Sequence, residues 1–278
     1  MSETFAGRLV EAGTFGLLEI SDPVTQGVYR GQSWHSVCGI LTGTQITVDP
    51  PVVRSEREKM SARTFTEEAW ERTAEIRAAI DELPFLTQLE DGSLPREIFE
   101  HYMGKDAAYL THYARALAAC ALQSTDPEHI IFWSQAAAGA IEEERALHAT
   151  HVVDFAAVTP TPTTVAYTSY ELGLVSAGSL PVLAASLLPC FWIYDDVGTR
   201  LKARVGSLSG HPYADWISAY GDPEFHLLTE TAKGIVNDLA GTASDQTRAA
   251  MHQAYYRASQ YEWMFWDAAY RQESWPVG

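Results

Sequence analysis

The chain has 278 residues, of which 46% are hydrophobic, and it carries a formal net charge of −17. A chain of this length and composition can bury a substantial core, which excludes a disordered protein. The acidic excess excludes a nucleic-acid-binding surface, because the phosphate backbone would be repelled.

The first 59 residues differ in composition from the rest of the chain. They are rich in Gly, Thr, Ser and Val, show no sustained periodicity and end in an extended linker around residues 48–55. A regular helical pattern begins at Met60. We therefore expect residues 1–59 to be an extension, either a flexible leader or an artefact of start-codon choice, and residues 60–278 to form a helical domain.

From Met60 onward the sequence predicts helices that are separated by Gly and Pro turn signals. The predicted helices cover residues 66–80, about 95–122, 127 to about 158 and 244 to about 272, with two more around Tyr167 and Cys190. Thr161 and Pro162 are the expected cap and first residue of the helix around Tyr167. Because no strand alternation and no repeat is visible, the predicted fold class is all-α, a helical bundle.

The predicted helix around Cys190 carries a thiol directly after a proline. An inward-facing stripe at intervals of four and three residues is formed by Leu183, Leu187, Cys190, Tyr194, Val197 and Leu201. Pro189 has no backbone N–H to donate, so the helix is expected to bend there. Taken alone, the pattern is more typical of a buried cysteine in a kinked core helix than of a pocket.

Two further predicted helices place a carboxylate on an apolar stripe. Glu262 stands where the last helix would be expected to carry leucine, and Asp106 lies among aromatic residues. An inward carboxylate must be paired, hydrogen-bonded or protonated, so it is either structural or a candidate acid or base. Inward polar groups on three separate helices indicate one aromatic-walled pocket for a small molecule. The tyrosines available to line it include Tyr109, Tyr167, Tyr194 and Tyr220.

One predicted helix offers a metal-binding spacing, at Glu144 and His148. The two residues could ligate a metal, but a hydrogen-bonded pair inside the bundle is the commoner arrangement. A di-iron site needs about six His or carboxylate ligands on facing helices, and only this one helix offers such a pair. We therefore expect no metal and no cofactor.

The cysteines and the apolar runs indicate the compartment. Cys38, Cys120 and Cys190 form no CxxC pair, which favours a reducing setting over a disulfide framework or a zinc site. No apolar run approaches membrane-spanning length, and the N-terminus lacks a signal sequence. We expect a cytoplasmic protein that binds neither membrane nor nucleic acid.

Several motifs, in order along the chain, resemble the TenA (thiaminase II) family. They are residues 91–95 (DGSLP), 105–110 (KDAAYL), 142–148 (EEERALH), 162–170 (PTTVAYTSY), 187–192 (LLPCFW), 261–266 (YEWMFW) and 269–271 (AYR). The resemblance covers about residues 65–276 and implies a heme-oxygenase-like helical bundle that assembles as a homotetramer. It also implies a hydrolase of thiamine salvage that cleaves aminomethyl-pyrimidine breakdown products of thiamine, or thiamine itself, to hydroxymethylpyrimidine.

The resemblance also implies roles for individual residues. Cys190 would be the nucleophile, Glu262 would handle a ring nitrogen and its proton, and Asp106 would bind the ring amino group. The substrate pocket would be lined by Tyr109, Tyr167, Tyr194 and Tyr220. Val165 stands where the family has an aromatic residue, which could reshape the pocket.

Three other functions remain open on the sequence. A di-iron oxidase of the same helical superfamily would use Glu144 and His148, but it lacks further ligand pairs. A non-catalytic pyrimidine- or thiamine-binding regulator would not need the thiol. A haem-binding oxygenase would need a well-placed proximal histidine, and none stands out. The small-molecule hydrolase is the function that the sequence favours.

Overall fold

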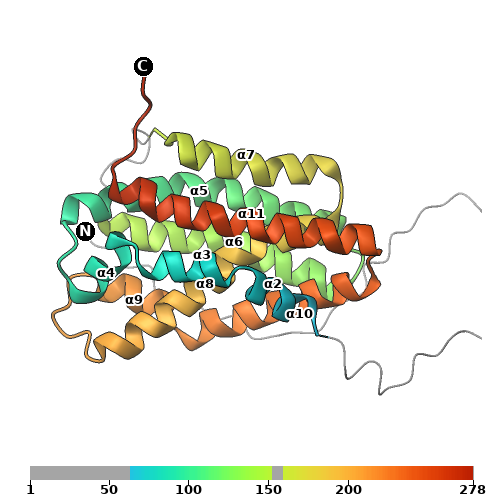
Figure 1. Ribbon diagram of the computed structural model, residues 1–278, viewed down its shortest axis with the longest axis horizontal. Coiled ribbons are helices and arrows are strands. Elements are labelled where there is room, and N and C mark those ends of the chain that lie inside the picture. The colour runs from blue at the N-terminus through green and yellow to red at the C-terminus, as the bar shows by residue number, and fades with distance from the viewer. Residues whose placement is uncertain (1–62, 152–158, 278) are drawn as a thin grey trace, which may run out of the picture. The chain divides into compact units, whose positions relative to one another are not determined.

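The computed structural model describes residues 63–151 and 159–277, without the side chains of residues 143–151 (Figure 1). The predictions for residues 1–59, for Glu144 and His148, and for a helix end near residue 158 lie outside what is described. All described residues belong to one unit, residues 54–278. They form ten helices and no strand: α2 (Phe65–Arg72), α3 (Ala74–Asp81), α4 (Pro84–Asp91), α5 (Arg96–Gln123), α6 (Pro127–His151), α7 (Pro162–Ala177), α8 (Leu180–Val205), α9 (Ala214–Tyr220), α10 (Pro223–Thr242) and α11 (Asp245–Tyr270).

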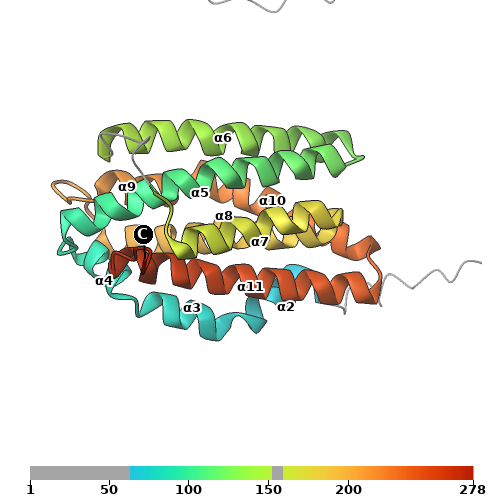
Figure 2. The same ribbon diagram turned by 90° about the horizontal axis from the view of Figure 1, so that it is seen from above.

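The long helices lie along a common direction and form a bundle in which α8 is central (Figures 1 and 2). Helix α8 contacts α5, α7, α9, α10 and α11, and α5 also packs along α6. Seen from above, α6 and α11 lie on opposite sides of the bundle, with α5, α7 and α8 between them (Figure 2). The predicted all-α class is confirmed for the described residues, and any group on the inner face of α8 faces several other helices.

Helix α8 runs through Pro189 without ending, and its predicted inward stripe is buried. Leu183, Leu187 and Tyr194 are at most 4% exposed, whereas Cys190 is only half-buried. Among the described helices, α8 is also the one that is long and apolar enough to cross a membrane, which the sequence analysis did not expect. However, 67% of its most apolar 18-residue segment is buried in the bundle, as in the core helix of a soluble protein.

The predicted helix over residues 66–80 is wrong in one respect, because it is two helices. The break lies at Thr73, which is buried and ends α2. The Thr73 hydroxyl donates to the carbonyl of Ala69 at 2.9 Å, and the Arg77 guanidinium donates to the carbonyl of Trp70 at 2.7 Å. These side chains occupy carbonyls that would otherwise accept backbone N–H groups, so the helix can restart in a new direction.

The remaining helix boundaries follow local capping chemistry. Thr161 accepts from the backbone N–H of Thr164 and Pro162 is the first residue of α7, as predicted. Ser244 caps α11 in the same way. Helix α4, which was not predicted, begins at Pro84 and ends at Asp91, and the following Gly92 has a φ of 77°, which suits a left-handed C-cap.

A stack of aromatic and cationic side chains attaches α8 to its neighbours just beyond Cys190. The rings of Trp192 and Trp70 are stacked with centroids 4.0 Å apart. The guanidinium of Arg77 lies 3.6 Å from the centroid of Trp70, and the ammonium of Lys233 lies 4.2 Å from that of Trp192. Such cation–π contacts contribute about 0.5–1 kcal/mol each at accessible sites. The stack therefore helps to fix the position of the Cys190 turn.

Gly198 allows the close approach of α8 to the end of α9. A Cβ atom at Gly198 would lie 2.4 Å from the backbone carbon of Tyr220, a distance that requires the backbone to move. We expect Gly198→Ala to destabilise the fold by about 3 kcal/mol, the upper part of the range for overpacking. Gly173→Ala in α7 is the matched control, because nothing lies within 4 Å of its Cβ position. The control is expected to stabilise by about 0.5–1 kcal/mol.

Urea unfolding of both variants measures this difference. Equal stability of Gly198→Ala and the parent would show that α8 and α9 can separate freely.

Candidate active site

The Cys190 thiol lies on the inner face of α8 against the tyrosines of α5. The hydroxyls of Tyr109 and Tyr113 both interact electrostatically with the thiol. Tyr113 also donates to the carbonyl of Leu187 at 2.9 Å, which holds its ring beside the thiol-bearing turn. Because Cys190 is only half-buried while these tyrosines are buried, part of it borders space that water can occupy.

Glu262 on α11 is a buried carboxyl group, as its stripe predicted. It is 2% exposed, and the Tyr167 hydroxyl of α7 donates to its Oε1 at 2.7 Å. Burial raises the pKa of Glu262 to about 8, a rise that the Tyr167 hydrogen bond opposes and the Asp106 charge increases. Glu262 is therefore mostly protonated at neutral pH and can act as an acid.

Asp106 on α5 is a second buried acidic residue, and it acts on Tyr102 and Tyr194. It is 4% exposed, and its charge raises the pKa of both these tyrosines and of Glu262. The hydroxyls of Tyr102 and Tyr194 are 3.2 Å apart. Asp106 therefore faces the same interior region as Glu262, as the two stripes predicted.

The predicted tyrosines form aromatic walls on two sides of these groups. The ring centroids of Tyr109 and Tyr167 are 4.8 Å apart, and those of Tyr194 and Tyr220 are also 4.8 Å apart. Tyr109, Tyr167 and Tyr194 are buried and Tyr220 is half-buried. The structure thus brings together the residues singled out from the sequence, with Tyr220 joining the others through the ring of Tyr194. Flat aromatic faces of this kind suit a planar heterocycle.

The surroundings keep the Cys190 thiol in its neutral form. Burial raises the pKa of Cys190 well above its usual value, and the charges of Glu262 and Glu171 raise it further. The nearby Tyr109 hydroxyl opposes this rise in the pKa of Cys190. A neutral thiol is a weak nucleophile and reacts readily only with an electrophile that is itself activated, for instance by protonation.

Glu171 on α7 is a further buried carboxyl group that the sequence analysis missed. It is fully buried, and the Tyr109 hydroxyl donates to its Oε1 at 3.0 Å. Burial raises its pKa well above the usual range, and the Glu262 charge adds to the rise. The sequence could have indicated Glu171 through its spacing of four residues from Tyr167, because residues four apart lie on one face of a helix.

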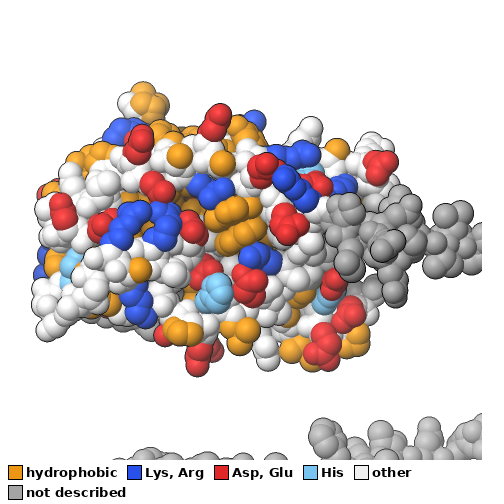
Figure 3. Space-filling view, turned by 60° about the horizontal axis from the view of Figure 1, so that its bottom comes forward, with side chains coloured by type: hydrophobic (Ala, Val, Ile, Leu, Met, Phe, Trp, Pro, Cys, Tyr) orange, Lys and Arg blue, Asp and Glu red, His pale blue; other side chains and the backbone are white. Residues whose placement is uncertain are grey.

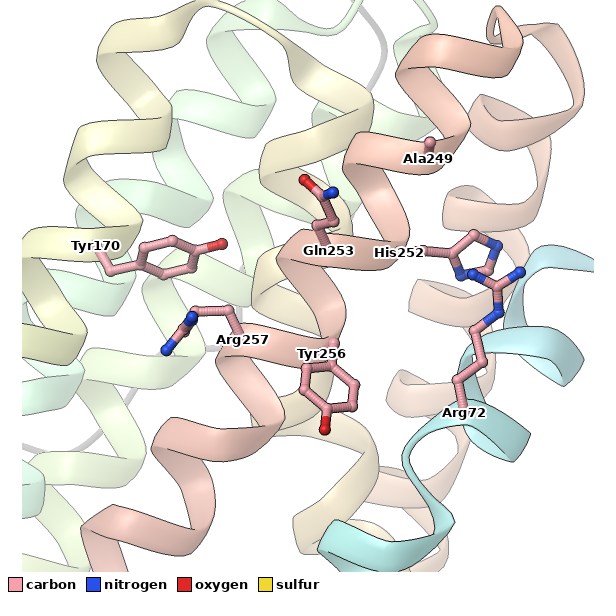
Figure 4. Close-up of a pocket in the computed structure, with 7 residues that line it drawn as sticks. All are labelled: Arg72, Tyr170, Ala249, His252, Gln253, Tyr256 and Arg257. Carbon is pink, nitrogen blue, oxygen red and sulfur yellow. The ribbon is translucent and has the colours of Figure 1, made fainter.

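The protein surface shows a separate pocket of about 550 Å³ along α11 (Figure 4). Its lining comprises Arg72, Tyr170, Ala249, His252, Gln253, Tyr256 and Arg257. Burial and the adjacent Arg72 charge lower the pKa of His252, whose ring lies beside the Arg72 guanidinium (Figure 4). None of the predicted site residues lines this pocket, so it is distinct from the cluster around Cys190.

Two other observations concern the surface and metal binding. Val165 is 38% exposed, so its expected effect on the pocket is not supported: it lies on the outer side of α7. Acidic and basic side chains are interspersed on the face shown in Figure 3. Among the side chains that the structure describes, no three His, Cys, Asp or Glu residues cluster in a way that could hold a metal ion.

Fold and cluster together define a class: an all-helical protein whose interior brings a thiol, carboxyl groups and tyrosine hydroxyls together. The chain belongs to the TENA/THI-4/PQQC family, whose model matches residues 70–272. This confirms the family resemblance inferred from the motifs.

Two curated relatives give the extent of the similarity. The aminopyrimidine aminohydrolase of Bacillus subtilis (strain 168) is 33% identical over 219 residues, which cover 76% of this chain and 92% of that protein. The thiamine biosynthesis multifunctional protein ThiED of Corynebacterium glutamicum is 32% identical over 228 residues. Those residues cover 82% of this chain but 29% of ThiED, so the chain spans less than a third of the length of that multifunctional relative.

Solved structures confirm the fold. The TenA homologue protein from P. horikoshii OT3 superimposes with a TM-score of 0.67 at 24% identity, covering 75% of this chain and 99% of that one. A domain with a heme oxygenase-like fold from Shewanella denitrificans OS217 gives a TM-score of 0.58 at 14% identity, covering 76% and 94%. The predicted heme-oxygenase-like bundle is therefore confirmed.

Proposed function

We propose that the protein is a hydrolase of thiamine salvage, which converts aminomethyl-pyrimidine breakdown products of thiamine, or thiamine itself, to hydroxymethylpyrimidine. The observation that carries the proposal is the meeting of the Cys190 thiol with the buried carboxyl groups of Glu262 and Asp106 inside tyrosine walls. The similarity to aminopyrimidine aminohydrolases supports the substrate class.

In this proposal the two carboxyl groups bind and activate the pyrimidine ring. Asp106 accepts a hydrogen bond from the ring amino group, and Glu262 gives its proton to a ring nitrogen. A pKa of about 8 keeps that proton available at neutral pH. The rings of Tyr109 and Tyr194 flank the heterocycle, and Tyr167 and Tyr220 complete the pocket.

The thiol then acts on the activated ring. The Cys190 sulfur adds to a ring carbon, and the thiol proton passes to the Glu262 carboxylate. The adduct expels the leaving group with the electron pair of the C–N bond. Water then adds to the exocyclic methylene carbon and gives up one proton, which replaces the proton that leaves with an amine and passes to solvent when thiazole leaves. Departure of the sulfur, which takes its proton back from Glu262, restores the aromatic ring, and the ring nitrogen returns its proton to the Glu262 carboxylate. Dividing one displacement into addition and elimination replaces a difficult step by easier ones.

Product analysis tests this function directly. Thiamine, the free aminomethylpyrimidine and its N-formyl derivative would be offered side by side to the purified protein, and the products identified by mass spectrometry. We expect hydroxymethylpyrimidine to form from at least one of the three. Tight binding of a pyrimidine with no product from any of them would instead favour a non-catalytic binding protein.

We also propose that the protein is a cytoplasmic homotetramer. The family resemblance supports the assembly, and the sparse cysteines, none of which has a CxxC neighbour, support a reducing compartment. Light scattering on the full chain gives the mass of the assembly in solution, and cell fractionation gives its location.

A further inference from the structure

The proposed reaction leaves one buried acidic group of the cluster without a role. Glu171 is fully buried, and its Oε1 accepts from the Tyr109 hydroxyl. Its Oε2 is buried and has no hydrogen-bond partner among the residues that the structure describes. A buried carboxyl oxygen without a partner typically costs about 1–3 kcal/mol. Such an atom inside a substrate site is a candidate for a contact that forms only with the ligand.

Glu171 and Asp106 act on different tyrosines of the cluster. Asp106 acts electrostatically on Tyr102 and Tyr194, whereas Glu171 acts on Tyr109, Tyr113 and Tyr167. Both carboxyl groups act on Cys190. If Asp106 holds the ring amino group, Glu171 is placed for a different part of the same substrate.

The chemistry of the leaving group indicates which part. When the C–N bond breaks, the electron pair stays on nitrogen, and an unprotonated amine would leave as an amide ion, which is far too basic. The nitrogen must therefore carry an additional proton when it leaves, so that the product is neutral ammonia. Thiamine differs, since its thiazolium nitrogen carries no hydrogen and leaves as neutral thiazole without a proton. The reaction of an aminomethylpyrimidine therefore needs a second acidic group that thiamine cleavage does not need.

We propose that Glu171 Oε2 binds the leaving nitrogen of an aminomethylpyrimidine and holds the proton that departs with it. The proposal rests on the function proposed above and names a residue for one substrate class. The carboxyl group and the amine share one proton, as acid and amine or as carboxylate and ammonium. When the C–N bond breaks, its electron pair stays on nitrogen and ammonia leaves. The water that adds to the methylene carbon returns one proton to the Glu171 carboxylate, so protons and charge balance.

The test compares two substrates in one variant. Glu171→Gln keeps the shape of the side chain and removes the acidic proton. We expect kcat/KM for the aminomethylpyrimidine to fall about a hundredfold or more, the usual effect of losing a general acid, and kcat/KM for thiamine to change less than about fivefold. Thr168→Val is the matched control: it is buried on the same helix, and its hydroxyl bonds to carbonyls of that helix. For this control we expect kcat/KM to equal that of the parent for both substrates.

A binding experiment separates this proposal from the proposed function. In a Cys190→Ser background, calorimetry would compare the aminomethylpyrimidine with hydroxymethylpyrimidine, which lacks the nitrogen. Adding Glu171→Gln is expected to weaken binding of the amine at least tenfold and to leave binding of the alcohol unchanged. Equal losses for both ligands, or equal losses of thiamine and amine turnover, would overturn the role of Glu171 while leaving the hydrolase function intact. Absence of turnover by the parent would instead refute the hydrolase function.

Discussion

Replacing Cys190 with serine is expected to abolish turnover while pyrimidine binding survives. Serine preserves the shape of the side chain beside Tyr109 and Tyr113, but its hydroxyl is a much weaker nucleophile than a thiol. Removing the nucleophile of a covalent mechanism typically lowers kcat by about a thousandfold or more. The measurement is product formation by mass spectrometry, together with calorimetric binding of hydroxymethylpyrimidine.

Cys120→Ala is the matched control for Cys190. Cys120 is fully buried on α5, and burial raises its pKa further from neutrality. We expect this control to retain the turnover of the parent. Comparable rates for Cys190→Ser and the parent would refute the assignment of Cys190 as nucleophile, and loss of binding in Cys190→Ser would mean that the substitution disturbs the pocket itself.

Replacing Glu262 with glutamine is expected to lower the rate by about two to four orders of magnitude, because the ring loses its acid. The pKa of about 8 gives the parent a specific pH dependence. Activity of the parent should fall as the pH rises through about 8, when Glu262 loses its proton. The variant should lack this alkaline limb, and a pH profile equal to that of the parent would contradict the role.

The same substitution has an effect on stability that does not depend on activity. The folded-state pKa of Glu262 lies above its ordinary value of 4.5, so the folded protein binds more protons than the unfolded chain between about pH 4.5 and pH 8. Stability is therefore lost as the pH rises through this range. At pH 7 the raised pKa of Glu262 lowers the free energy of unfolding by on the order of 3 kcal/mol relative to low pH. Glu262→Gln removes this contribution, because glutamine does not titrate. Denaturant unfolding of both proteins at pH 5 and pH 8 should show the difference widening with pH, and a constant difference would argue against the raised pKa.

Much of the bundle could be predicted because its inner faces are apolar. The apolar stripes that contain Cys190, Glu262 and Asp106 repeat at helical spacing. These three residues were therefore visible as polar exceptions within apolar faces. Burial of these stripes then required Cys190 and Glu262 to point inward. The convergence of the helices on one cluster followed from their having a common core.

Glu171 and the helix break at Thr73 could not be predicted, because neither is marked by a pattern of apolar residues. The inner face of α7 carries Thr164, Tyr167, Thr168 and Glu171, so no hydrophobic period marks it and Glu171 does not stand out. The break at Thr73 depends on side-chain bonds to the carbonyls of one helix, which sequence periodicity does not register. Buried polar faces and side-chain hydrogen bonds that end a helix are recognised only in the folded structure, where their hydrogen-bonding partners can be seen.

The neutral state of the Cys190 thiol has a consequence for its behaviour toward oxidants and alkylating agents. Peroxides and ordinary electrophiles react with the thiolate, and susceptibility follows thiolate character and accessibility. A sulfur held as S–H by burial and flanking acids is therefore expected to resist conversion to sulfenic acid by peroxides. The same property is expected to favour protonatable heterocycles over haloacetamides as covalent labels of Cys190.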